Sequence, residues 1–387
     1  MSKNKSKDKH RIQTKLIHSG SLRSQNNETS EAIYLTSGYI YNSAEEAEAR
    51  FKGELDGYIY SRYSNPNLTM LEKKLCEMEG AESARLTSSG MAAVFWALFT
   101  NLQSGDHIVA ADALFGSCLS ILKDILPNYG IEVTIVRASK MEDWEKSIKK
   151  NTKVFFFETP TNPMLEIIDI WKLSQIAKEN NIKVIIDNVF ATPLRQRPME
   201  FGADIVIYSA TKHIDGQGRC LGGVILGDAE FIENKLHDYL KHTGPALSPF
   251  NAWIMMKGLE TLSIRTDRQI DSAKKVTDYL VDLEKINGVI YPGHKSHPEY
   301  GIAQKQMTGG GPIVTFKVNG GKKEAFDFLN KLALIKISNN LGDARTLITH
   351  PKTTTHRNLS EAECMNLGIT DSTLRMSLGL EDIDDII

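Results

Sequence analysis

The chain has 387 residues, of which 41% are hydrophobic and 24% charged, with a formal net charge of −2 at pH 7. This ordinary globular balance allows two or three structural parts and gives no reason to expect nucleic acid or an anionic membrane as a partner. No apolar run approaches the roughly 20 residues that cross a bilayer. The basic start, MSKNKSKDKHR, has no apolar segment after it, so it predicts a solvated tail and no secretory signal. The four cysteines form no C-x-x-C pair, which fits a reducing cytoplasm.

Residues 1–64 carry few helix or strand signals, and we expect them to form an extended arm that packs on a neighbouring subunit. Residues 65–258 alternate helical patterns with short apolar runs. The helical patterns lie at 68–80, 88–102 and 169–181. The strand-like runs lie at 107–112, 131–136, 153–159, 183–188, 204–209 and 222–227. This alternation predicts an α/β domain with a mostly parallel sheet flanked by helices.

The character of the sequence changes over residues 259–387. A long amphipathic helix is predicted at 262–286, and strands are predicted at 311–318 and 332–338. These elements favour a smaller C-terminal α+β domain.

Polar and aromatic side chains follow the strand-like runs of the large domain, where a parallel sheet binds its ligands. They are Asp112 with Phe115, Glu158 with Asn162, Asp187 with Asn188, and Ser209 with Thr211 and Lys212. Because the carboxyl ends of parallel strands share one edge of a sheet, we expect a lysine, carboxylates and hydroxyls to meet in one crevice.

A phosphate site is predicted beside them. The stretch TSSGMAAV opens a helix, whose free N–H groups and dipole attract an anion, and Gly90 lets a phosphate approach the backbone at Met91. Ser209 and Thr211 are two residues apart, so on an extended chain both face one side and can donate to the phosphate, while Lys212 faces the other side.

One cofactor, pyridoxal 5′-phosphate, uses this whole set: a lysine for a Schiff base, a carboxylate for the ring nitrogen, a phosphate cradle and an aromatic face. We assign these roles to Lys212, Asp187, the cradle and Phe115. Each residue alone also has an ordinary interpretation. Lys212 could be a solvated strand end, Asp187 a turn residue or cap, the Ser-Ser-Gly stretch only a helix cap, and Phe115 part of the core. Two other motifs fail: GQGRCLGG lacks the third glycine of a dinucleotide fingerprint and opens no helix, and the histidines lack metal-ligand spacing.

The segments YIYSRYSNPN, TSSGMAAV, ETPTNP, DNVFATP, SATKHIDGQG, NLGDARTLITHP and LRMSLGLE resemble the Cys/Met metabolism, or transsulfuration, family of pyridoxal-phosphate enzymes. The resemblance runs from about Lys15 to the C-terminus. It implies the aspartate-aminotransferase type of fold (fold type I) and a homotetramer made of two tight dimers.

The resemblance also implies roles for individual residues. It makes Lys212 the Schiff-base lysine and Asp187 the partner of the ring nitrogen. The residues that it assigns to the cofactor phosphate are Gly90, Met91, Ser209 and Thr211, with Tyr60 and Arg62 reaching the phosphate of the neighbouring subunit. The residues that it assigns to the substrate or its surroundings are Arg375 for the α-carboxylate, Asn162 near the cofactor's phenolic oxygen, and Asn340 and Thr355.

Three positions depart from the usual family pattern: Phe115 replaces a tyrosine, Ser117 replaces the cysteine of methionine γ-lyases, and Asn339-Asn340 replaces Glu-Ser of the cystathionine enzymes. These departures, with ALFGSC and ISNNLGDARTLITHPKTTTH, resemble the sulfhydrylases that act on O-succinylhomoserine. The implied reaction is a γ-replacement, in which O-succinylhomoserine and sulfide give homocysteine and succinate. The sequence leaves open an acetyl ester, cysteine as the nucleophile, elimination without a nucleophile, and a relative that binds the cofactor without catalysis.

Overall fold

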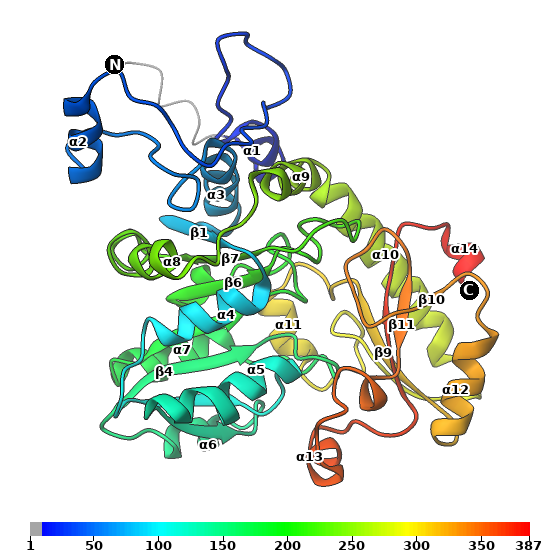
Figure 1. Ribbon diagram of the computed structural model, residues 1–387. Coiled ribbons are helices and arrows are strands. Elements are labelled where there is room, and N and C mark those ends of the chain that lie inside the picture. The colour runs from blue at the N-terminus through cyan, green and yellow to red at the C-terminus, as the bar shows by residue number, and fades with distance from the viewer. Residues whose placement is uncertain (1–9) are drawn as a thin grey trace.

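The computed structural model describes residues 10–387, so the expected solvated tail lies outside the described residues apart from His10 and Arg11 (Figure 1). Its large sheet has seven strands. In spatial order they are β1 (Ser83–Thr87), β7 (Gly223–Gly227), β6 (Ile205–Ser209), β5 (Lys183–Asp187), β4 (Thr152–Glu158), β2 (His107–Ala111) and β3 (Glu132–Val136). All run parallel except β7, which pairs antiparallel with both β1 and β6. The mostly parallel sheet expected from the apolar runs is therefore confirmed.

Both faces of this sheet are buried, and β6 shows why its sequence is apolar throughout. Ile205 and Ile207 pack into one hydrophobic core, while Val206 and Tyr208 pack into a second core on the opposite face. The first core includes α4 (Gly90–Phe99) and α7 (Ile170–Glu179), and the second includes α3 (Pro66–Glu79) and α9 (Pro249–Glu260). A sheet covered in this way binds ligands at its strand ends.

A second, smaller sheet has its own core. Its strands, in spatial order, are β10 (Lys336–Ile337), β11 (Leu347–Thr349), β12 (Thr373–Ser377), β9 (Ile313–Val318) and β8 (Ile286–Ile290). The 20-residue helix α10 (Leu262–Val281) follows α9 and extends along the smaller sheet, where its Ala273, Val276 and Leu280 pack into the smaller core (Figure 1).

The remaining α-helices are short. They are α1 (Ile12–His18), α2 (Ala44–Lys52), α5 (Gly116–Ser120), α6 (Met141–Lys146), α8 (His237–Thr243), α11 (Tyr300–Gln306), α12 (Lys322–Lys331), α13 (Glu361–Asn366) and α14 (Ile383–Ile386). Among the described residues, no helix combines the length and the hydrophobicity needed to span a membrane.

The N-terminal segment is more ordered than its sequence indicated, because it contains α1 and α2. Helix α2 begins at the Ser43 cap, whose side chain accepts a hydrogen bond from the Glu46 N–H, and it ends at Gly53 in the left-handed conformation. It buries none of its residues, and Figure 1 shows it standing away from both sheets. A helix stabilised by its caps and charges has no apolar stripe, so the search for hydrophobic periodicity missed it.

Candidate active site

A cavity of about 230 Å³ lies at the carboxyl ends of β4, β5 and β6, beside the first turn of α4. Most of the residues predicted for the site line it. They are Gly90, Met91, Phe115, Asn162, Asp187, Ser209, Thr211, Lys212, Thr355 and Arg375. Asn340 joins them through a hydrogen bond to Lys212, whereas Tyr60 and Arg62 do not line the cavity. The structure thus brings together predicted residues that are up to 285 positions apart in the sequence, from Gly90 to Arg375.

Lys212 enters the cavity from a turn. Strand β6 ends at Ser209, and the Lys212 N–H donates to the Ser209 carbonyl at 3.2 Å. The extended chain expected through Thr211 is therefore wrong, and the turn lets Ser209, Thr211 and Lys212 line the same cavity. Lys212 Nζ donates to Asn340 Oδ1 at 2.5 Å. Burial, and then the Arg375 charge, lower the pKa of Lys212 to about 8, which increases its neutral, nucleophilic form.

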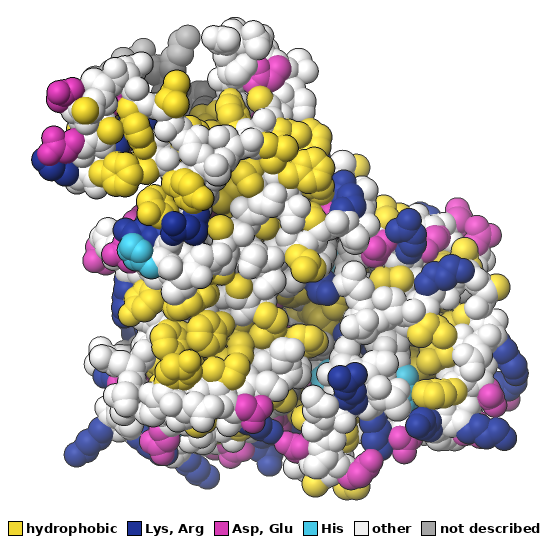
Figure 2. Space-filling model, in the orientation of Figure 1, with side chains coloured by type: hydrophobic (Ala, Val, Ile, Leu, Met, Phe, Trp, Pro, Cys, Tyr) yellow, Lys and Arg dark blue, Asp and Glu magenta, His cyan; other side chains and the backbone are white. Residues whose placement is uncertain are grey.

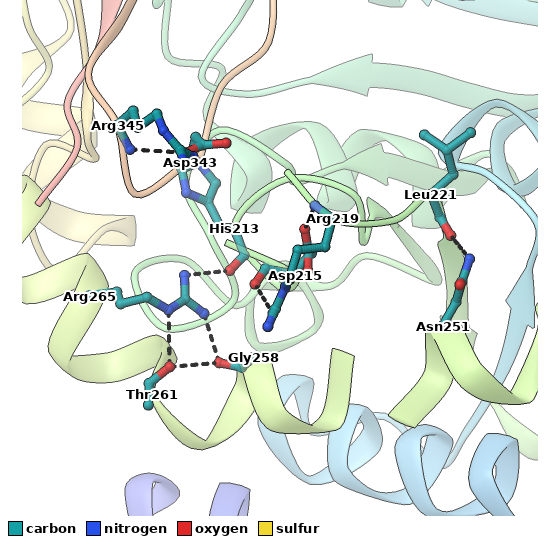
Figure 3. A network of polar contacts seen from close by, with 10 residues as sticks. All are labelled: His213, Asp215, Arg219, Leu221, Asn251, Gly258, Thr261, Arg265, Asp343 and Arg345. Atoms are coloured by element: carbon teal, nitrogen blue, oxygen red, sulfur yellow. Dashed lines mark hydrogen bonds and ion pairs between the residues drawn. The ribbon is translucent and has the colours of Figure 1, made fainter. Parts of the chain in front are cut away.

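The turn that carries Lys212 is fixed from behind by Arg265 of α10 (Figure 3). Arg265 Nη1 donates to the His213 carbonyl at 3.0 Å, and Nη2 donates to the Gly258 carbonyl at 2.7 Å. Gly216 makes room for this guanidinium: its φ is +71°, and a Cβ there would lie 1.8 Å from Arg265 Nη1.

Asp187 and Glu158 are register partners at the ends of β5 and β4, and both are buried. Asp187 accepts a hydrogen bond from the Val189 N–H at 3.1 Å, and Glu158 accepts one from the Phe115 N–H at 3.2 Å. Burial raises the pKa of Asp187 to about 6. Burial and the neighbouring Asp187 charge raise the pKa of Glu158 well above its ordinary range. At neutral pH Asp187 is therefore the ionised member of the pair.

Arg375 reaches the cavity from β12 of the smaller sheet. It is only 2% exposed, and burial lowers its pKa to about 10, so it stays charged at neutral pH. Its Nη1 donates to Asn162 Oδ1 at 3.0 Å, and its Nη2 donates to the Asn339 carbonyl at 2.8 Å. A guanidinium presented in this way suits a carboxylate.

The first turn of α4 lies against the end of β6. The Ser89 hydroxyl caps the helix by accepting from the Ala92 N–H at 3.2 Å. A Cβ on Gly90 would lie 2.6 Å from Ser209 Cβ, so glycine is what lets the helix end and the strand end meet. The N–H groups of a first helical turn have no acceptor inside the helix, and with the Ser209 and Thr211 hydroxyls they form a set of donors for a phosphate.

These groups fit pyridoxal phosphate. One cavity holds a half-buried lysine of lowered pKa, an ionised carboxylate, an aromatic ring at Phe115 and a cradle of neutral donors that a Cβ on Gly90 would fill. The residues that line the cradle carry no positive charge. The cradle itself therefore supplies hydrogen-bond donors but no cation to balance the phosphate charge.

Tyr60 and Arg62 form a cluster of their own outside the cavity. The Arg62 guanidinium lies 5.3 Å from the ring centre of Tyr60 and 4.9 Å from that of Tyr63, and its Nη1 donates to the Lys241 carbonyl. Within one chain these two residues do not reach the cradle, so the role predicted for them requires a second subunit.

Sequence reasoning left several lining residues without a role. They are Ser89, Val94, Cys118, Glu158, Val189, Phe190, Leu221, Asn339 and Leu341. Glu158 was predicted at the crevice as a strand-end carboxylate, without a role of its own, and it is the register partner of Asp187. One further signal was available: Val189-Phe190 directly follows the Asp187 strand end. The apolar members carry no chemical signature, so only the fold places them at the cavity.

Comparisons with known proteins agree with this geometry. The model of the family described as Cys/Met metabolism PLP-dependent enzyme matches residues 13–387. An O-succinylhomoserine sulfhydrylase of Mycobacterium tuberculosis is 48% identical over 375 residues, which cover 96% of this chain and 92% of that protein. An L-methionine gamma-lyase of Fusobacterium nucleatum subsp. polymorphum is 41% identical over 381 residues, which cover 98% and 96%.

A crystal structure of a protein assigned as an O-acetylhomoserine (thiol)-lyase of Campylobacter jejuni superimposes with a TM-score of 0.93 and 32% identity, over 98% of both chains. That protein carries an N′-pyridoxyl-lysine-5′-monophosphate. The fold type I architecture and the pyridoxal-phosphate cofactor expected from the sequence are thereby confirmed. The chain belongs to the Cys/Met metabolism family of pyridoxal-phosphate-dependent enzymes.

Proposed function

We propose that the protein catalyses the γ-replacement of O-succinylhomoserine by sulfide, giving homocysteine and succinate for methionine biosynthesis. The observation that carries this proposal is the 48% identity to a sulfhydrylase of that specificity across 96% of the chain. The cavity supports it, because a half-buried lysine of lowered pKa, an ionised aspartate and a buried arginine suit the chemistry of an amino-acid substrate. Phe115 in place of tyrosine also supports replacement over elimination.

The residues then have distinct roles. Arg375 binds the substrate α-carboxylate, and Asp187, the more acidic carboxyl of the pair, holds a negative charge opposite the ring nitrogen. The bound cofactor supplies an electron sink that acidifies the hydrogens of the substrate. Phe115 covers the ring, and Val189, Phe190 and Leu341 keep water from the reacting atoms.

Lys212 moves the protons. In its neutral form, Nζ takes the proton from Cα, and Asn340 Oδ1 keeps the amine in position. Because an amine carries one extra proton at a time, Lys212 would pass this proton to the bound cofactor and, neutral again, take the second proton from Cβ. The Cγ–O bond breaks and succinate leaves with the electron pair. Hydrosulfide forms the Cγ–S bond, and Lys212 returns the protons to Cβ and Cα. No proton, electron or co-reactant beyond the two substrates is needed.

The proposal is tested by assaying the purified holoenzyme with O-succinyl- and O-acetylhomoserine, each with sulfide, with cysteine and without a thiol. We expect the highest kcat/KM for homocysteine formation from the succinyl ester and sulfide. Because a γ-lyase is 41% identical to the chain, elimination is the second candidate. If 2-oxo acid and ammonia form without sulfide as fast as homocysteine forms with it, the enzyme is a lyase and γ-replacement is overturned. If cysteine is used in preference to sulfide, the product is cystathionine and the proposed nucleophile is wrong.

We propose further that the active site is completed by a second copy of the chain within a homotetramer built from two dimers. Hydrophobic side chains of the N-terminal segment are exposed, among them Leu35, Ile40 and Phe51 at 66%, 97% and 67%. Figure 2 shows such side chains over the N-terminal segment and over the α4 region below it. The α4 group is a chain of aromatic contacts formed by Phe95, Trp96, Phe99, Tyr129 and Tyr239.

A shared site predicts that two inactive variants restore each other. Arg62→Gln removes the cation offered to the partner, and Lys212→Ala removes the lysine of its own site. When the two chains are co-expressed with different tags, a mixed dimer has one site with both residues, so about a quarter of wild-type activity is expected for random pairing in symmetric dimers. Purified mixed dimers without activity would contradict a shared site, and each variant expressed alone is the control.

A further inference from the structure

A second and larger cavity, of about 800 Å³, adjoins the first. It lies between α5, the segment from Ile337 to Asn339, and the loop from Thr353 to Leu359. Phe115, Asn339 and Thr355 line both cavities. A substrate whose amino-acid end is held at Arg375 and Lys212 therefore extends its side chain past these three residues into the outer cavity.

The outer cavity contains four charged side chains, and two of them are already paired. Lys123 Nζ lies 2.6 Å from Glu363 Oε1. The other two are Asp124 and Arg357. Asp124 is the residue after Lys123, on the segment that follows α5. Arg357 lies across the cavity, on the loop from Thr353 to Leu359. Within residues 10–387, the Arg357 guanidinium forms no ion pair and no side-chain hydrogen bond, so it is available to an anion in the cavity.

The loop that carries Arg357 is fixed to the inner site. His356 Nε2 is 3.1 Å from the Asn162 carbonyl, and Asn162 Oδ1 accepts from Arg375 at 3.0 Å. Burial, and then Arg375, lower the pKa of His356 to about 4, so this histidine is neutral and adds no charge of its own. The loop position of Arg357 is thereby set relative to the arginine that binds the α-carboxylate.

The reach of the substrate matches this arrangement. From Cα to the terminal carboxyl carbon, an extended O-succinylhomoserine spans about 8 Å at the rise per bond of an extended chain. Two residues of backbone from Thr355 to Arg357 span at most about 7 Å. A succinyl group that passes Thr355 ends within reach of the Arg357 side chain, and an acetyl group ends in a methyl before it.

We infer that Arg357 binds the terminal carboxylate of the acyl group and so selects a dicarboxylic half-ester over an acetyl ester. This inference rests on the proposed function for its substrate. A guanidinium pairs with a carboxylate through two parallel hydrogen bonds, and it has no such partner in an acetyl group. The pair forms equally in the ground state and in the transition state, so it affects KM and leaves kcat unchanged.

Arg357→Gln tests the inference. We expect kcat/KM for O-succinylhomoserine to fall about tenfold through KM, as for the loss of one charge-assisted interaction, with no change for O-acetylhomoserine. Arg357→Lys keeps the charge and should recover part of the loss. Arg345→Gln is the matched control, because Arg345 is an exposed arginine that lines neither cavity. An equal loss with both esters, or no loss with the succinyl ester, would overturn the assignment.

A binding measurement separates this inference from the proposed reaction. 2-Aminononanedioate has the chain length of the succinyl ester without a leaving group, and 2-aminononanoate lacks its terminal carboxylate. Calorimetric titration of the holoenzyme should show tighter binding of the dicarboxylate, and Arg357→Gln should remove that preference. If wild type turns over neither ester yet shows this preference, the proposed function fails and the Arg357 site stands. If Arg357→Gln keeps the preference, the Arg357 site fails whatever the reaction.

Discussion

Replacing Lys212 by alanine is expected to reduce homocysteine formation at least a thousandfold, as for the loss of a nucleophile that is also the base. The structure gives the reason, because Lys212 is the one lysine among the residues that line the inner cavity. The cradle at α4 and the Asp187 carboxylate remain in the variant, so the cofactor should still bind without a covalent link. Absorbance spectra and dialysis separate covalent from reversible binding.

The control for this variant is Lys153→Ala, which removes an exposed lysine from β4 and leaves the cavity untouched. It should keep wild-type turnover and wild-type retention of the cofactor. Homocysteine synthesis by Lys212→Ala within tenfold of wild type would show that another group moves the protons.

Replacing Arg375 by glutamine should lower kcat/KM for the amino-acid substrate about a hundredfold or more, as when one partner of a buried charged pair is removed. Most of this loss should appear in KM, because the α-carboxylate contact exists before and during the reaction. Arg85→Gln is a suitable control, since Arg85 pairs with Glu72 and Glu233 outside both cavities of the site.

The same variant makes a second prediction about pH. The Arg375 charge is the second cause, after burial, that lowers the pKa of Lys212 to about 8. Without that charge the pKa of Lys212 rises, so less of its amine is neutral at a given pH. The rate at which the apo-protein attaches pyridoxal phosphate should therefore reach half of its maximum at a higher pH than in wild type. An unchanged midpoint would show that Arg375 acts on the substrate alone.

The layers of the large sheet could be predicted from the sequence because five of the six recognised strands are almost wholly buried on both faces and so appear as apolar runs, whereas β3 is mostly half-exposed. The sequence was also sufficient for the cluster at the strand ends, since parallel order alone brings Asp187 and Lys212 together. It missed β1, whose five residues SARLT include two polar side chains and an arginine.

Sequence reasoning was weaker wherever the site depends on contacts between distant segments. The hydrogen bond from Lys212 to Asn340 joins residues 128 positions apart, and nothing in the local pattern indicates it. The turn after Ser209 was predicted as extended chain because the contact that stabilises it comes from Arg265 on α10, and Arg265 is itself held by the Gly258 carbonyl of α9. The place of Arg357 in the outer cavity was not visible at all, because an exposed arginine on a loop carries no periodic signal.

Helix α10 links the two parts of the chain that share the site. Its first turns hold the lysine turn through Arg265, and its later turns pack into the core of the smaller sheet, which supplies Arg375. The groups proposed to hold the cofactor therefore belong almost entirely to the large sheet, and the group proposed to recognise the substrate belongs to the smaller one. The large sheet therefore carries most of the cofactor pocket, the smaller sheet carries the carboxylate clamp, and α10 fixes the position of one relative to the other.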